Sequence, residues 1–402
     1  MTVDAPSRPA QAERRARAAV AVLFFTNGAL FANLLPRYPQ IKADLDMSNA
    51  VYGLAVAAFP AGAIVAGLAA GAAIRRLGSA RAAVTGTLLT GAGILAAGLA
   101  DSVALFAGAL FLAGAMDSVT DVAQNAHGLR VQRRYGRSII NSFHAIWSIG
   151  AVAGGSMAAA AIALGLSRGQ HLTFSAVVFA IAACVALRFC LTGPENDRAP
   201  ESDGDGLVKR SAGPAMPGRR AVYVLAALVL IATAGTLVED AGSSWATLYL
   251  SGSLQASITL AAFGYIALVG AQFVGRIIGD RLVDRFGQRT VARAGGLIAA
   301  AGMGLALAVP TVPGTILGFA AAGFGVATLV PAAMHEADEL PGLKPGSGLA
   351  IVSWLMRLGF LASPPIVGLV TDATSLRAGL LVVPLAGLLA FLLAGVLQPR
   401  HR

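Results

Sequence analysis

Twelve long apolar stretches alternate with short polar segments along this chain of 402 residues. A helix needs about 20 apolar residues to cross the hydrocarbon core of a bilayer, and each stretch is close to that length or longer. The pattern therefore predicts an all-α membrane protein with twelve transmembrane helices. The predicted helices cover residues 18–36, 49–74, 82–100, 103–127, 138–164, 172–191, 221–250, 257–279, 291–309, 314–335, 347–371 and 377–397.

The composition favours a membrane protein over a soluble one. Hydrophobic residues make up 56% and charged residues 12% of the chain, whereas soluble domains carry about 25% charged residues. The net charge of +10 does not indicate nucleic-acid binding, because the basic residues punctuate the apolar stretches instead of clustering on a polar domain. Cys184 and Cys190 lie six residues apart in one apolar stretch, a spacing that predicts neither a disulfide framework nor a metal site.

Basic residues are concentrated in alternate polar segments, and this bias predicts the orientation of the chain. Cytoplasmic loops retain Lys and Arg during membrane insertion. The segments assigned to the cytoplasm hold Arg75, Arg76, Arg81, Arg130, Arg133, Arg134, Arg137, Lys209, Arg210, Arg219, Arg220, Arg281, Arg285, Arg289 and Arg293. The opposite loops hold only Arg37, Lys42, Arg168 and Arg377. We therefore expect a multi-pass protein of a bacterial inner membrane, with an uncleaved first span and both termini in the cytoplasm.

The two halves of the chain follow the same plan, with a short basic loop after the second span of each half, at 71–81 and 279–289. Duplication of a six-helix unit explains this match, and parallel repeats of this kind place a transported solute between the halves near the bilayer midplane. We expect two pseudo-symmetric six-helix bundles. The predicted parts are a tail at 1–17, a bundle at 18–192, a polar linker at 193–220, a bundle at 221–397 and a tail at 398–402.

The loop Leu282–Arg289 resembles a conserved cytoplasmic loop of the major facilitator superfamily, in which it tethers neighbouring helices. The resemblance assigns this structural role to Asp284, Arg285 and Gly287, and to Gly78 in the first half, where Arg75 stands in place of the expected aspartate. Within the superfamily the chain is similar to the fucose–proton symporter branch and its uncharacterised bacterial relatives. The residues that carry this similarity are Leu34-Leu35-Pro36, Asp121 to Asn125, Trp245, Gly275 to Gly279, Gly346-Ser347, Pro365, Gly368 and Asp372.

Two departures from relatives refine the expectation. An aspartate that the fucose symporter needs four residues before the Leu-Leu-Pro proline is Ala32 here, so fucose itself is not the expected solute. Drug antiporters of the superfamily carry a Gly-Pro motif on the fifth span. Here that span has Gly150, Gly154 and Gly155 without proline, which favours uptake over export.

Ionisable side chains within the apolar stretches are candidates for function, because each costs about 2.5 to 3.5 kcal/mol in the bilayer centre. Asp117 and Asp121 lie four residues apart, on one face of the fourth span, where two carboxylates repel and sharing a proton is favoured. We predict that Asp121 carries a coupled proton, assisted by Asp117 and by His144 on the fifth span. Alternatively, Asp121 is a structural acceptor for His144.

The other candidates would bind the solute. Glu239 on the seventh span and Arg357 on the eleventh are expected to form an ion pair, either opened by solute or permanent. Trp147 and Trp245 are rings suited to stacking on a sugar, although Trp245 also fits an anchor at the membrane interface. Asn27, Asn125 and the neighbouring Gln124 add neutral donors and acceptors that suit hydroxyl groups.

Together these features predict a secondary transporter that works by alternating access, with proton-coupled uptake of a small hydroxylated solute such as a sugar. No ATP-binding loop is present, no enzyme activity or cofactor is expected, and the predicted partners are a small solute, protons and the lipid bilayer. We expect a monomer. The alternatives are a proton-driven exporter of drugs or metabolites on the same fold, and a transporter-like receptor or lipid-handling protein.

Overall fold

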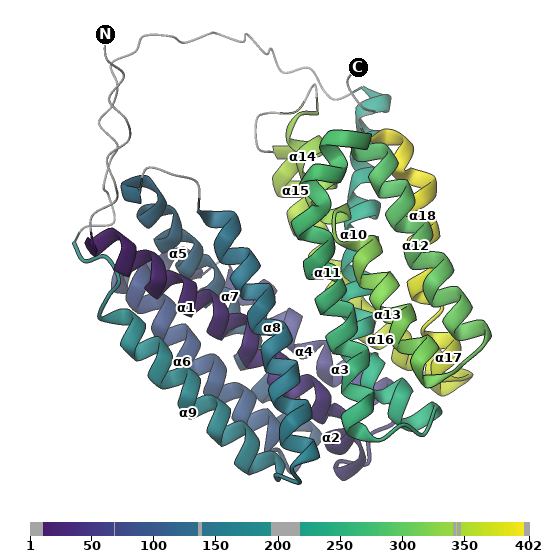
Figure 1. Ribbon diagram of the computed structural model, residues 1–402, viewed down its shortest axis with the longest axis horizontal. Coiled ribbons are helices and arrows are strands. Elements are labelled where there is room, and N and C mark those ends of the chain that lie inside the picture. Colours follow the sequence, from purple (N-terminus) through teal and green to yellow (C-terminus); the bar gives the residue numbers. More distant parts are fainter. Residues whose placement is uncertain are drawn as a thin grey trace. The chain divides into compact units, whose positions relative to one another are not determined.

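The computed structural model describes residues 11–67, 69–135, 139–193, 218–340, 343 and 347–397, and the regular elements in these ranges are all helices (Figure 1). Twelve helical segments are long and apolar enough to cross a membrane, which confirms the predicted twelve-span architecture. Residues 1–10 of the predicted N-terminal tail, residues 194–217 of the predicted linker and the predicted tail at 398–402 lie outside the described residues.

The helices form two compact units. Unit 1 comprises Met1–Arg37 and Ala58–Asp205, and unit 2 comprises Tyr38–Ala57 and Gly206–Arg402. The described helices of unit 1 are α1 (Gln11–Leu34), η1 (Leu35–Arg37), α4 (Ala58–Gly67), α5 (Ala70–Leu77), α6 (Ser79–Gly98), α7 (Val103–Tyr135), α8 (Ile140–Ala163) and α9 (Arg168–Leu187). The segment Tyr38–Ala57 therefore packs with unit 2, although the residues on either side of it along the chain belong to unit 1.

Unit 2 has more interruptions within its spans. Its described helices are α2 (Tyr38–Asp44), α3 (Asn49–Val56), α10 (Arg219–Leu248), η2 (Tyr249–Ser253), α11 (Ile258–Phe286), α12 (Gln288–Ala308), α13 (Val312–Val326), α14 (Leu329–Asp338), α15 (Ser347–Leu355), α16 (Arg357–Ala373), α17 (Leu376–Gly379), α18 (Val382–Leu393) and η3 (Ala394–Val396). Breaks of this kind are tolerated within membrane spans where neighbouring helices and polar side chains satisfy the freed backbone groups.

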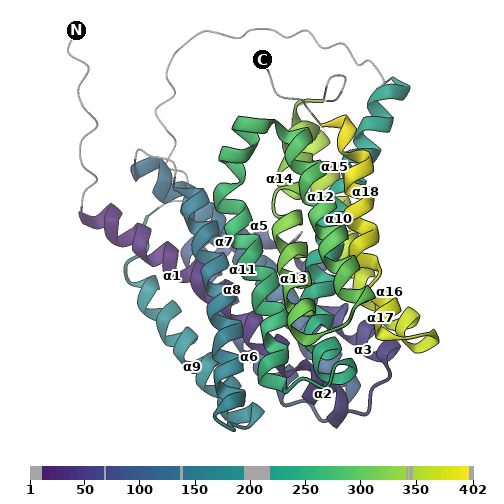
Figure 2. The ribbon, with the colours of Figure 1, turned by 45° about the vertical axis from the view of Figure 1, so that its right-hand side comes forward.

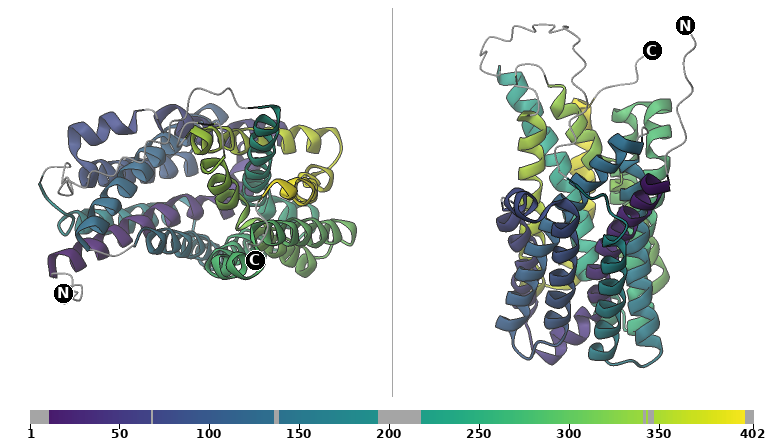
Figure 3. Two further views of the ribbon diagram at one scale, coloured as in Figure 1. Left: turned by 90° about the horizontal axis from the view of Figure 1, so that it is seen from above. Right: turned by 90° about the vertical axis from the view of Figure 1, so that its left-hand side faces the viewer.

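The same pairs of spans pack together in both units. In unit 1, α1 lies along α8, α6 along α7 and α4 along α7; in unit 2, α10 lies along α16, α12 along α13 and α11 along α13. Within each unit the long helices run side by side, as the views in Figures 2 and 3 agree. In each half the first span packs on the fifth, and the second and third spans pack on the fourth. The packing therefore supports the duplication inferred from the basic loops.

Gly78 and Gly287, at the two basic loops, have nearly the same backbone conformation. Gly78 has φ 82° and ψ 154° between α5 and α6, and Gly287 has φ 81° and ψ 153° between α11 and α12. Each N–H donates to the carbonyl four residues earlier, at 2.8 Å to Ile74 and 2.7 Å to Val283. Only glycine adopts this region readily, so the backbone requires glycine at both positions. Asp284 and Arg285, just before the second of these glycines, are exposed.

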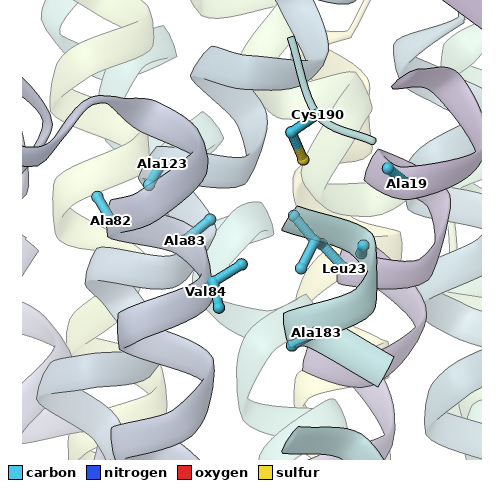
Figure 4. Packing of buried hydrophobic residues seen from close by; sticks show 9 residues of the cluster. Ala19, Leu23, Ala82, Ala83, Val84, Ala123, Ala183 and Cys190 are labelled. Carbon is cyan, nitrogen blue, oxygen red and sulfur yellow. The ribbon is translucent and has the colours of Figure 1, made fainter. Parts of the chain in front are cut away.

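A core of small side chains holds four helices of unit 1 together. Figure 4 shows Leu23 of α1 facing Ala83 and Val84 of α6, and the cluster also contains Ala19 of α1, Ala82 of α6, one residue of α7, two of α9 and a cysteine just beyond α9. Small residues allow helix backbones in a membrane to approach closely, and van der Waals packing then provides much of the association energy. This packing fixes the helices on which the polar residues described below are placed.

Candidate functional site

Asn27 of α1 is the centre of a polar network in unit 1. Its Nδ2 donates to Asp117 Oδ1 of α7 at 2.6 Å. Its Oδ1 accepts from Trp147 Nε1 of α8 at 2.9 Å and from Gln124 Nε2 of α7 at 3.3 Å. The bonding pattern orients the amide, since the oxygen faces two donors and the nitrogen faces a carboxylate. Asn27 is only 5% exposed, so the network is an interior feature of unit 1.

Glycines bring α1 and α8 close enough for the contact between Asn27 and Trp147. A Cβ on Gly28 would collide with the carbonyl oxygen of Trp147, and a Cβ on Gly150 would collide with the carbonyl oxygen of Phe25. Gly154 faces Ala29 in the same way one turn further along. The two backbones therefore touch over at least two turns, and the network depends on side chains being absent at these positions.

The predicted proton-binding pair lies on α7 within this network. Asp121 Oδ1 accepts from Asn125 Nδ2 at 3.0 Å and lies 3.5 Å from Gln124 Nε2, while Asp117 is held by Asn27. The structure thus brings together Asn27, Asp117, Asp121, Asn125 and Trp147, which sequence reasoning selected separately.

His144 of α8 is exposed, and its ring packs edge-on against Phe24 with centroids 5.3 Å apart. The predicted helper of the proton-binding pair thus lies three residues before Trp147 on the same helix. Among the described residues, no group of three or more His, Cys, Asp or Glu side chains is arranged to hold a metal ion.

The predicted ion pair between Glu239 and Arg357 is wrong for this structure. Glu239 Oε2 of α10 accepts from Gln272 Nε2 of α11 at 2.7 Å and lies 3.6 Å from Arg276 Nη2 of the same helix. Arg357 is exposed at the start of α16. The neighbouring helix α11 provides both an amide and a guanidinium for Glu239. Arg276 was not selected from the sequence, although a charged residue inside the predicted eighth span was a signal for it.

Trp245 of α10 is buried in unit 2, with no exposed surface. Its ring packs edge-on against Tyr52 of α3, with centroids 4.9 Å apart. An anchor at the membrane interface keeps one edge near water and lipid headgroups, so the alternative interpretation of Trp245 as such an anchor does not hold. Ser244 and Ser363, which lie beside Asp240 of the same helix α10, were not selected from the sequence, because serine is common in membrane helices.

Comparison with known proteins shows the family. A sequence model described as the Major Facilitator Superfamily matches residues 20–334 and 240–402. The chain belongs to the Major Facilitator Superfamily. An uncharacterized transporter, y4wD of Sinorhizobium fredii, is 30% identical over 379 residues, which cover 94% of this chain and 97% of the relative. These matches confirm that this superfamily member is a transporter and not an enzyme.

Solved structures of the superfamily share the fold. A D-xylose–proton symporter has a TM-score of 0.70 and 16% identity, covering 95% of this chain and 96% of the symporter. The transporter FucP in its outward conformation has a TM-score of 0.59 and 20% identity, covering 96% of this chain and 99% of FucP. The match to FucP agrees with the resemblance inferred from the sequence. At these identities the likeness concerns the fold alone.

Proposed function

We propose that this superfamily member takes up a small hydroxylated solute, such as a sugar, together with protons, and that the Asn27 network of unit 1 binds the solute. One observation carries the proposal: Asn27 bonds simultaneously to a carboxylate, an amide and an indole ring from two other helices. A carboxylate for the proton, amides for hydroxyl groups and a ring for the apolar face of a sugar thus meet in one network.

The network has an acceptor that a hydroxylated solute would satisfy. Gln124 Oε1 is buried and has no hydrogen-bond partner within the described part of the chain. An unpaired buried acceptor costs about 1 to 3 kcal/mol. A solute hydroxyl that donates to this oxygen would remove that cost. Trp147 beside it offers the aromatic surface on which the apolar face of a sugar ring stacks.

Proton coupling is assigned to the two aspartates of α7. Asp117 and Asp121 lie one turn apart, so a proton on either relieves their repulsion. We assign the carried proton to Asp121, with Asp117 and His144 assisting it. Asn27 then connects proton and solute: neutralising the pair weakens the charge-assisted bond from Asn27 to Asp117 and frees the amide that also bonds Gln124 and Trp147.

The proposal also covers the membrane that holds the protein, the orientation of the chain, transport by symport and the oligomeric state. The arrangement of Lys and Arg supports cytoplasmic termini in a bacterial inner membrane, and the shared fold of a D-xylose–proton symporter is consistent with symport. We propose a monomer, with the basic loops at Gly78 and at Asp284, Arg285 and Gly287 holding neighbouring helices. The solute-binding roles of Glu239, Trp245 and Arg357 in unit 2 stay predictions.

Flux measurements on the purified full chain in lipid vesicles test the proposal. A pH-sensitive dye inside the vesicles should report acidification when D-xylose, L-fucose or uridine is added outside, for whichever probe is carried. Asp121→Asn should abolish accumulation driven by a proton gradient while leaving exchange of labelled for unlabelled probe across the membrane. Asp338→Asn, at the exposed end of α14, is the matched control and should accumulate the probe normally.

Two results would contradict the proposal. Gradient-driven uptake that survives Asp121→Asn unchanged would remove the proton from this site. Movement of the probe outward, against an entering proton flux, would instead identify an exporter on the same fold.

A further inference from the structure

A second buried carboxyl lies in unit 2, outside the Asn27 network. Asp240 of α10 is 9% exposed, and its Oδ2 has no hydrogen-bond partner within the described part of the chain. Its neighbours include the hydroxyls of Ser244, one turn further along α10, and of Ser363 on α16. Ser363 is fully buried, and its hydroxyl also has no partner that meets hydrogen-bond geometry among the described residues. The Asp240 carboxyl and the Ser363 hydroxyl therefore lie beside each other in one buried location, although neither Asp240 Oδ2 nor the hydroxyl has a partner at hydrogen-bond geometry within the described residues.

Two buried tyrosine side chains lie near this location. Tyr38 of α2 and Tyr52 of α3 are both close enough to Asp240 to be affected by its charge, and both are buried. Their rings pack edge-on at 5.6 Å, and Tyr52 packs in the same way on Trp245. The Tyr52 hydroxyl donates to the Ser244 carbonyl at 2.7 Å, which bonds α3 to α10 one turn beyond Asp240.

No cation compensates the charge of Asp240 within the described residues. Of the charged groups on the surrounding helices, Glu239 is a carboxylate and repels it, and Arg276 lies beside Glu239. Lys42 of α2 lies near Asp372 and Asp46, Arg357 is exposed at the start of α16, His335 of α14 pairs with Glu339, and α18 has no ionisable side chain. Tyr38, Tyr52 and Tyr265 are neutral at physiological pH. An uncompensated carboxylate in such a place is costly.

We propose that Asp240, with Ser244 and Ser363, is a proton-binding site separate from the Asp117–Asp121 pair and covered by Tyr38 and Tyr52. A proton removes the charge, and the resulting O–H finds an acceptor in a serine hydroxyl. A metal ion fits less well, because hard cations take about six oxygen ligands, and this location offers one carboxylate and two hydroxyls.

The two tyrosines that cover the proposed site lie on a segment that is linked along the chain to unit 1. Tyr38 and Tyr52 belong to the segment Tyr38–Ala57, which packs in unit 2 and is continuous along the chain with two helices of unit 1. Release of the proton leaves a charge beneath this segment. That charge requires water, and water reaches it when the segment separates from α10.

Infrared difference spectroscopy tests the site on the purified full chain in lipid vesicles. Spectra taken in acid and alkaline buffer should contain the carbonyl band of a protonated carboxyl that is lost in Asp240→Asn and shifted in Ser363→Ala. Glu239→Gln is the matched control, one residue away on the same helix, and should retain the band. Asp240→Glu should restore a band at a shifted position, which separates loss of the group from loss of the fold.

Three results would overturn the inference: a spectrum of Asp240→Asn identical to that of the unmodified chain, a band that does not respond to pH, and a band that sodium chloride removes but choline chloride does not. The last would assign the site to a sodium ion. None of these measurements involves solute flux, so the failure of coupling at Asp121 would leave this site standing, and the reverse also holds.

The cover is tested separately through Tyr52→Phe, which keeps the ring and removes the hydroxyl bonded to Ser244. Deuterium should then reach the Asp240 carboxyl about fivefold faster, the factor that corresponds to the loss of one hydrogen bond of about 1 kcal/mol. Tyr223→Phe, an exposed tyrosine near the start of α10, is the control and should leave the rate unchanged. An unchanged rate in Tyr52→Phe would show that this bond does not close the site.

Discussion

The carboxylate of Asp372, near the end of α16, holds the N-terminus of α3, and replacing it should loosen that helix. Asp372 Oδ1 accepts from the backbone N–H of Asn49 at 3.0 Å and from its side chain at 2.8 Å. Its Oδ2 accepts from the N–H of Ala50 at 2.7 Å, and the N–H of Val51 donates to Ser48 Oγ at 3.2 Å. The first three amides of α3, which have no partner inside the helix, are thus all satisfied.

The size of the effect follows from these contacts. Asp372→Ala removes a cap from two backbone donors and a negative charge from the positive end of a helix dipole. Loss of a cap costs about 0.5 to 2 kcal/mol, and a charge at a helix end contributes about 0.3 to 1 kcal/mol where water screens it. Because Asp372 is exposed, we take the lower half of each range and expect a loss of about 1 to 2 kcal/mol in the docking of α3 onto α16.

Hydrogen exchange at the amides of α3 is the direct assay. When local opening limits exchange, its rate follows the free energy of that opening, and a loss of about 1 to 2 kcal/mol corresponds to a factor of roughly 5 to 30. The amides of Asn49–Val56 should therefore exchange about 5 to 30 times faster in Asp372→Ala. The difference should shrink in high salt, because the charge is exposed.

Asp280→Asn serves as the matched control, since it removes an exposed aspartate from α11 of the same unit. Exchange in α3 should be unchanged in this variant. If Asp372→Ala left the exchange of Asn49 and Ala50 within a factor of two of the unmodified chain, the carboxylate would not be stabilising the helix end, and the reasoning would be refuted.

Two further changes test the loops and the core. Gly287→Ala should lower the free energy of unfolding by about 1 to 3 kcal/mol, because φ 81° is strained for alanine. The control Gly108→Ala, in open space on α7, should leave the free energy of unfolding unchanged. Equal melting temperatures of the two variants would contradict this reasoning. Burial raises the pKa of the Cys190 thiol to about 11. In Cys184→Ser, in which Cys190 is the remaining cysteine, the rate of maleimide labelling should therefore keep rising about tenfold per pH unit beyond pH 9. A plateau near pH 9 would contradict that burial.

The spans could be predicted because lipid imposes a length and a composition on each of them. The predicted stretch 257–279 lies within α11, except for its first residue. The glycine that follows α11, Gly287, was placed correctly in a loop. Neighbours across the bundle could not be predicted in this way. Asn27 and Trp147 are 120 residues apart, and only the contact of α1 with α8 through glycine shows that they share a bond.

The failures have a physical pattern. The sequence selected Glu239 and Arg357 as opposite charges at similar depth, but depth does not specify which helix face a charge occupies, and Glu239 faces α11 and Arg276 instead. The second span was predicted as one helix over 49–74, but the structure divides it into α3, α4 and α5, with α3 packed against α16. Hydropathy does not record such a division, because α3 beyond Asn49 and all of α4 are apolar and α5 becomes polar only at Arg75 and Arg76.

The surroundings of the two carboxyl sites suggest different tasks. Asp117 and Asp121 lie among amides and an indole N–H, groups that exchange hydrogen bonds with a hydroxylated solute at little cost. Asp240 lies near tyrosine rings and two serines, and Tyr52, one of these tyrosines, donates a hydrogen bond to the Ser244 carbonyl. Binding of a proton among amides changes the hydrogen bonds that the amides can offer to a solute. A proton beneath aromatic rings can leave only when the segment that carries these rings moves. The first site therefore suits the coupling of proton to solute, and the second suits the coupling of proton to the movement of the segment Tyr38–Ala57.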